Sequence, residues 1–157
     1  MRLILCLSAL GIGLLSASST KADWQNTTWE MTRDEVVRVT GAEPMEGDEG
    51  QSVAGADLRA TGTYEALGFQ FRSQFFFDRT DRLRMVKIVM DEVDRCPELK
   101  RTMDGIYGNP AEDRRISSLW IDGRSGDQVR FTGPMPPIVN HCFVTYAPVA
   151  ASGGRGL

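Results

Sequence analysis

The clearest periodic segment of the chain covers residues 67–77, where apolar and polar side chains alternate. The apolar positions of this segment are Leu67, Phe69, Phe71, Phe75 and Phe77. Alternation with a period of two over such a length is typical of a strand that buries one face. Phe76 would point away from that face. We interpret the alternating phenylalanines as core; the other interpretation is an aromatic ligand-binding surface.

Weaker apolar segments lie on both sides of this strand. Residues 78–81 predict a turn, and residues 83–90 predict a partner strand with an irregularity near Met85 that indicates a bulge. Because so few residues connect the two strands, they should pair as an antiparallel hairpin. Residues 57–65 are a further strand candidate, and the acidic, glycine-containing residues 46–55 read as a loop.

A first helix is predicted over residues 32–40 by signals at both of its ends. Thr32 and Glu35 have the spacing of a capping box, in which each side chain bonds the backbone amide of the other residue. Gly41 is placed to end the helix in the left-handed conformation, and Pro44 prevents its continuation.

A second helix is predicted around residue 100. Pro97 suits a first helical turn, and Gly108 and Pro110 close the segment. The apolar positions between these residues recur at helical spacing and share one face: Leu99, Met103, Ile106 and Tyr107. This stripe predicts a helix that packs against the rest of the domain.

Three more strands are predicted, over residues 116–122, 127–132 and 141–147. Helices on one face of an antiparallel sheet bury both the helical stripes and the apolar strand faces, so the predicted fold class is α+β with two short helices on one face. We expect a single domain over residues 23–148 and a flexible tail over 149–157. Because the order of elements recurs over about 29–92 and 93–148, a tandem helix–strand–strand–strand repeat is a further hypothesis.

The N-terminal segment has the layout of a cleaved secretory signal peptide. Arg2 precedes an apolar run over residues 3–15, and small residues follow as far as Ala22. A membrane-spanning helix needs about 20 apolar residues, so we expect no stable membrane anchor after cleavage. The candidate cleavage sites follow Ala17 and Ala22. We favour the second, which makes residues 1–22 the signal peptide and places the protein in the periplasm or outside the cell.

The net charge of the chain limits the classes of partner that it can bind. The 157 residues include 18 basic and 21 acidic side chains, a net charge of −3. Cleavage after Ala22 would remove Arg2, Lys21 and no acidic residue, which would lower the net charge to −5. Such a chain is poorly suited to binding a phosphate backbone, so we expect no nucleic-acid partner.

Two cysteines, Cys96 and Cys142, lie outside the predicted signal peptide. In an exported protein such a pair is most simply a disulfide, which is our prediction. The alternative is a pair of free thiols.

The segment from Trp29 through Gly41 and Pro44 resembles the helix-opening segment of two groups of small secreted bacterial domains. These are the beta-lactamase-inhibitory-protein-like domains and the outer-membrane assembly lipoproteins. Their helix opens with a glycine, a methionine and a serine or threonine; here Met31 and Thr32 match, and Glu30 replaces the glycine. The lipoproteins' lipidated cysteine has no counterpart. The resemblance implies protein binding on a sheet surface and no catalysis.

Candidate chemistry is sparse. His141 is the single histidine and adjoins Cys142, but neighbours on a strand point to opposite faces. The acidic residues between 91 and 98 lack the spacing of a calcium loop, and acids at a helix start are expected from the helix dipole. Arg114 and Arg115 could bind an anion or could lie in a solvated loop. We expect no catalytic residue, metal site or cofactor.

The remaining feature is a proline-rich loop over residues 133–138. Three prolines stiffen this loop, and its tip is apolar, which suits contact with a partner. The candidate contact residues are Met135, Pro136, Pro137 and Ile138. Alternatively, the loop covers the open end of the sheet.

These observations favour an exported, non-enzymatic protein-binding module that acts as an inhibitor or as an envelope scaffold or assembly factor. The expected partner is a protein or another envelope component. Two alternatives stay open: a small secreted hydrolase that uses paired carboxylates, and a small-molecule carrier with an apolar cavity between helices and sheet.

Overall fold

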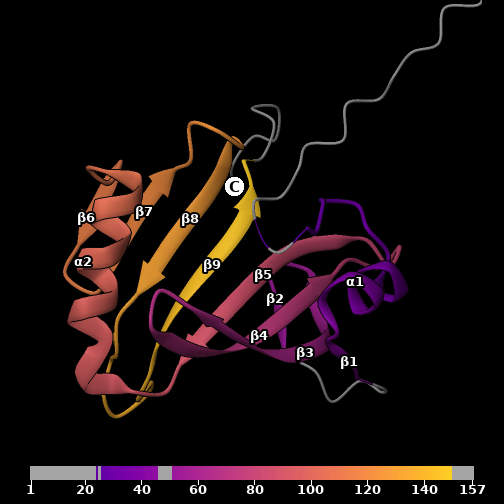
Figure 1. Cartoon of the computed structure of the whole chain (residues 1–157), viewed down its shortest axis with the longest axis horizontal. Helices are drawn as coiled ribbons and strands as arrows, with labels where there is room; N and C mark the ends of the chain where they lie inside the picture. The colour runs from indigo at the N-terminus through magenta and orange to yellow at the C-terminus, as the bar shows by residue number, and fades with distance from the viewer. Residues whose placement is uncertain (1–23, 25, 46–50, 150–157) are drawn as a thin grey trace, which may run out of the picture.

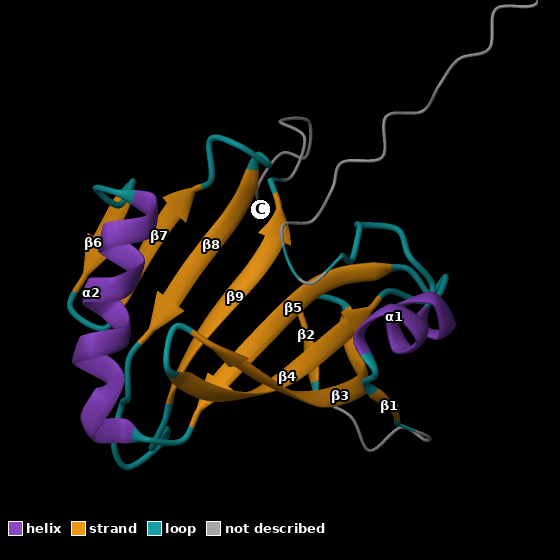
Figure 2. Ribbon diagram, viewed as in Figure 1, coloured by secondary structure: helices purple, strands orange, loops and turns teal. Residues whose placement is uncertain are grey.

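The structure, a computed structural model, describes residues 24, 26–45 and 51–149. The predicted signal peptide and most of the predicted tail lie outside these residues. The described part has α+β architecture, dominated by one antiparallel sheet (Figures 1 and 2). Its elements are α1 (Arg33–Thr40), β1 (Glu43–Pro44), β2 (Ser52–Val53), β3 (Ala56–Ala66), β4 (Phe69–Phe77), β5 (Leu83–Met90), the 3₁₀ turn η1 (Val93–Arg95), α2 (Cys96–Tyr107), β6 (Glu112–Arg114), β7 (Ser117–Ile121), β8 (Asp127–Thr132) and β9 (Cys142–Pro148).

The sheet runs in the order β1-β3-β4-β5-β9-β8-β7-β6, and β2 pairs with the same strand, β3, as β1 does. At its centre β5 and β9 pair over five positions, from Val86 opposite Tyr146 to Met90 opposite Cys142. In the figures α1 lies near one end of the sheet and α2 near the other. The halves of the chain therefore meet along the last strand of each.

The ends of α1 follow the sequence signals. The Thr32 hydroxyl accepts from the Glu35 amide at 3.3 Å, and the Glu35 carboxylate accepts from the Thr32 amide at 2.8 Å. Gly41 ends the helix at φ 71°, where a side chain would be strained. The predicted capping box is confirmed.

Both helices contribute to one core on one face of the sheet. Val36 of α1 and Leu99 and Met103 of α2 belong to the same buried cluster as the inward-facing strand side chains. Those side chains include Phe69, Phe71, Phe75, Phe77, Val86, Trp120, Val129 and Val144. The prediction that the alternating phenylalanines form core is confirmed for these four positions of β4.

Two side-chain predictions need correction. Leu67 is 63% exposed, because it and Gly68 form the tight turn between β3 and β4 with positive φ at both residues. Ile106 is 44% exposed, while the neighbouring Tyr107 ring lies 6.2 Å from the Trp120 ring. Phe76 points to the opposite face, as predicted, and is fully buried there in a second, small cluster with Ala56 and Leu58.

The strand predictions hold for the long strands and miss the short ones. Strands β3, β4, β5, β7, β8 and β9 lie where they were predicted, and the bulge falls beside Met85, where Arg84 is the extra residue between β4 and β5. The segment 46–55 was read as a loop, yet it contains β2. The edge strands β1 and β6 were not predicted. The two halves thus differ in their short strands and in helix length, and the tandem repeat stays a prediction.

Within the described ranges, none of the helices combines the length and the apolar character that crossing a membrane requires.

Candidate functional site

The loop between β8 and β9 lies beside the start of α2, at the lower end of the sheet in Figure 1. The Gly133 amide donates to the Ile116 carbonyl at 2.7 Å, which ties the loop to β7. At the tip, Met135 and Val139 exchange backbone hydrogen bonds of 2.8 and 3.0 Å. The backbone of the loop is therefore fixed at its base and across its tip.

All four predicted contact residues are exposed. Ile138 is 78% exposed and Met135 is 39% exposed, and the two prolines between them are exposed as well. Burial is confined to the base, where Gly133 is buried and Pro134 half-buried. The exposure of the tip favours contact with a partner over the alternative interpretation, in which the loop covers the open end of the sheet.

An apolar hollow of about 270 Å³ opens next to this loop. Its apolar lining comes from η1, the first turn of α2 and the strand ends, and includes Val93, Pro97, Ile116, Phe131 and Pro134. Val93 and Ile116 are 37% and 39% exposed. We give the name loop-end apolar surface to these two residues of the hollow together with Met135 and Ile138 at the exposed tip of the neighbouring loop.

Sequence reasoning did not identify Val93 and Ile116 as part of this surface. They are more than 20 residues apart in the chain and belong to different elements. The predicted disulfide was the one signal that could place residues near 96 beside residues near 142.

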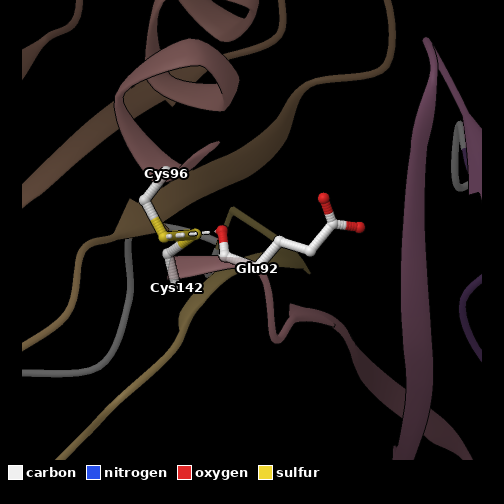
Figure 3. Close-up of a disulfide and its surroundings, with 3 residues drawn as sticks. All are labelled: Glu92, Cys96 and Cys142. Atoms are coloured by element: carbon white, nitrogen blue, oxygen red, sulfur yellow. Dashed lines mark hydrogen bonds between the residues drawn. A yellow bond between two sulfur atoms is a disulfide. The ribbon is translucent and has the colours of Figure 1, made fainter. Parts of the chain in front are cut away.

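The disulfide joins Cys96 of α2 to Cys142 of β9, with 5.9 Å between their Cα atoms (Figure 3). This confirms the predicted pairing. Both cysteines are buried, and Cys96 Sγ lies 4.0 Å from the Glu92 carbonyl oxygen, while the Glu92 carboxylate points away from the sulfurs. The bond fixes the start of α2 against the strand that follows the proline-rich loop.

A second, more polar hollow of about 430 Å³ adjoins the apolar one. Basic side chains from α2, from the end of β6 and from the β6–β7 turn line it: Lys100, Arg114 and Arg115. Asp113 and Ser118 also line it, and the Ser118 hydroxyl donates to the Asp113 carboxylate at 2.5 Å. Arg114 and Arg115, which the sequence offered as an anion site or a solvated loop, therefore lie at the rim of a hollow.

A third hollow, of about 480 Å³, is lined by residues of β3, β4 and the end of β5. Arg72 and Asp91 line it and form an ion pair, in which Arg72 donates to Asp91 through Nε at 2.9 Å and Nη2 at 2.8 Å. These hydrogen bonds lower the pKa of Asp91, so this carboxylate is ionised at neutral pH. A paired, ionised carboxylate is a poor general acid.

His141 adjoins the disulfide, and the Glu92 and Glu98 side chains are paired with an arginine. Burial lowers the pKa of His141, as does the nearby charge of Lys87, and the adjacent Cys142 is held in the disulfide. The Glu92 and Glu98 carboxylates pair with Arg95 at 3.4 and 3.0 Å. No group of three metal-ligating side chains occurs in residues 24, 26–45 and 51–149.

Comparison with protein-family models, with curated proteins and with solved structures finds no match to this chain. The resemblance of the first-helix segment to small secreted bacterial domains therefore stays an expectation from the sequence.

Proposed function

We propose that the protein is an exported, non-enzymatic protein-binding module whose contact surface is the loop-end apolar surface. The observation that carries this proposal is an apolar hollow lined by Val93 and Ile116, next to a loop whose exposed tip carries Met135 and Ile138, on a frame tied by the Cys96–Cys142 disulfide.

Single exposed apolar side chains are ordinary on a protein surface, whereas contiguous ones mark interaction sites. Here the backbone under the surface is held by hydrogen bonds and by the disulfide, so little conformational freedom is left to lose on binding. The arrangement therefore suits a partner that contributes apolar side chains to the interface. Such a contact serves an inhibitor and an envelope scaffold or assembly factor equally well.

Two features support export. The first 22 residues have the layout of a secretory signal peptide. The disulfide is of the kind that persists in oxidising compartments such as the bacterial periplasm. The two features are independent, because the cysteines lie far from the predicted signal.

The alternatives have less support. A carboxylate hydrolase needs an acid whose pKa is raised, whereas the pKa of Asp91 in the hollow over β3 and β4 is lowered. A carrier needs an apolar cavity between α2 and the sheet, whereas Leu99, Met103 and Trp120 pack into one buried cluster there. Protein contact at the loop end is the function that the geometry supports best.

We also infer that the two halves arose as a repeat. Each half has a helix followed by a three-stranded meander, β3-β4-β5 and β7-β8-β9. The last strands of the two meanders, β5 and β9, pair antiparallel at the centre of the sheet. This arrangement supports the predicted pseudo-repeats over about 29–92 and 93–148.

The double variant Met135→Ser with Ile138→Ser tests the proposed contact. Partners captured from envelope extract by the wild-type protein should lose about tenfold in affinity per apolar anchor removed. The matched control is Ile121→Ser with Val149→Ser, which removes two exposed apolar side chains, 46% and 42% exposed, at the opposite ends of β7 and β9. Mass spectrometry with quantitation of each captured protein gives the readout.

Equal capture by the loop variant and the wild type would overturn the proposal, provided that both melt at the same temperature. A loop variant that melts much earlier would show that these side chains stabilise the fold, and would overturn it too.

A further inference from the structure

We propose that the partner segment bound at the loop end carries an acidic side chain next to a large apolar one. The apolar side chain enters the hollow beside the proline-rich loop, and the carboxylate is bound by Arg115. This inference rests on the proposed function and names the chemistry of the partner at the same site.

The two hollows form one depression with an apolar half and a basic half. They share four lining residues, Lys100, Arg115, Ile116 and Phe131. Ile116 lines both hollows and also belongs to the loop-end apolar surface. An apolar group seated beside Ile116 therefore has the Arg115 guanidinium as a near neighbour.

Among the basic side chains at this depression, Arg115 differs in its pairing. Lys100 Nζ lies 2.8 Å from Asp104 Oδ1 and 3.9 Å from Asp113 Oδ1. Arg114 pairs with Glu112 at 3.1 Å. Within the described ranges Arg115 makes no ion pair, and it is exposed. A guanidinium without a carboxylate, at the rim of a hollow, is a site for a partner's carboxylate.

The apolar half, with a volume of about 270 Å³, is the part of the depression that an anchoring side chain would fill. Anchors of protein interfaces are single large side chains that fill pockets of this kind.

The same features favour a protein segment over a membrane surface or a free anion. A free anion would leave the apolar half empty. An anionic membrane surface is bound by clusters of basic residues, and a chain with a net charge of −5 after cleavage would be repelled by it. A segment that joins both groups at side-chain spacing fills the whole depression.

Selection from a displayed library of random peptides tests the inference. The protein, as purified from the cell, should enrich peptides in which Asp or Glu stands within two positions of Phe, Leu, Ile, Met or Trp. Replacing the acidic residue of the best peptide by its amide should weaken binding by about tenfold. The same loss should follow from Arg115→Gln, and the amide peptide should bind Arg115→Gln and the wild type equally.

Arg79→Gln is the control. Arg79 is an exposed arginine in the turn between β4 and β5 and, in the part of the chain that the structure describes, makes no ion pair, so its loss should leave peptide affinity unchanged. Enrichment of peptides without an acidic residue would overturn the inference, as would no enrichment at all. Tight binding to phosphatidylglycerol vesicles that is lost in Arg115→Gln would overturn it in favour of a membrane surface.

The inference and the proposed function can fail separately. If an envelope partner is lost in the Met135→Ser, Ile138→Ser variant but not in Arg115→Gln, the protein-binding function stands and the acidic partner segment is wrong. If no capture depends on the loop, the function itself is wrong, whatever the peptides show.

Discussion

At the scale of single residues, two buried tryptophans differ in whether the indole N–H has a hydrogen-bond acceptor. Trp24 and Trp29 are 4% and 5% exposed and belong to the same core. The Trp29 indole Nε1–H donates to Asp127 Oδ1 at 2.7 Å, which connects the N-terminal segment to β8. The Trp24 indole N–H has no acceptor among the described residues.

We expect Trp29→Phe to lower the free energy of unfolding more than Trp24→Phe does, by about 1–3 kcal/mol. Both changes remove similar volume, but only the first leaves the buried Asp127 carboxyl without its donor. Urea unfolding of the two variants measures the difference. Equal losses would show that the Trp29–Asp127 hydrogen bond contributes nothing to stability.

Asp78 organises the turn between β4 and β5. It accepts hydrogen bonds from the Thr80 hydroxyl at 2.7 Å, the Arg84 Nε at 2.7 Å and the Arg82 amide at 3.1 Å. These bonds hold the pKa of Asp78 well below its ordinary value of 3.8, with Thr80 the largest cause. Arg84 also pairs with Glu30, so the turn is connected to the segment before α1.

Asp78→Asn should lower the free energy of unfolding by only about 1 kcal/mol at neutral pH, because the carboxylate is partly exposed and solvent screens its interactions. Since the folded state lowers the pKa, the ionised group stabilises the fold above pH 3.8, and that contribution is lost as the pH falls through the lowered folded pKa. The difference in the free energy of unfolding between the variant and the wild type should therefore become smaller in acid. Urea titrations across this pH range measure it, with Glu65→Gln, an exposed strand carboxylate, as the control. A gap that is constant with pH would contradict the account.

At the scale of elements, local rules explain what could be predicted. The capping box of Thr32 and Glu35, the alternation in β4 and the glycine that ends α1 are signals within a few residues, and the structure follows each of them. The strands β1 and β6 were missed because they have two and three residues, and their pairing depends on β3 and β7 rather than on their own pattern.

In the candidate site too, features set by neighbouring residues could be predicted, and features set by distant residues could not. The proline-rich loop could be identified because its prolines and apolar tip are consecutive in the sequence. Val93 and Ile116 could not, because only the folded sheet and the disulfide bring η1 and the start of β7 to that loop.

Replacing both Cys96 and Cys142 by Ser should lower the free energy of unfolding by roughly 2–4 kcal/mol. The disulfide spans a sequence separation of 46 residues, and its loss returns conformational entropy to the unfolded chain. Urea unfolding of the double variant, compared with the oxidised wild type, gives the value, and the reduced wild type is the control for the Cys-to-Ser change itself. A reduced wild type that is as stable as the oxidised one would contradict this role.

At the scale of the whole molecule, the two helices lie near opposite ends of one sheet, and the loop-end apolar surface lies at the end beside α2. Ile121 and Val149 lie at the ends of β7 and β9 that are farthest from this surface, and they are 46% and 42% exposed. The molecule thus offers its own internal comparison between exposed apolar residues beside a hollow and exposed apolar residues at the other ends of β7 and β9.

Photo-crosslinking in the exporting cell tests the central claim most directly. A benzoylphenylalanine at position 138 should join the processed chain, which lacks residues 1–22, to a discrete partner protein. The same group at position 121 should give no such product. A partner joined from position 121 but not from position 138, or products formed only by the unprocessed chain, would contradict the account.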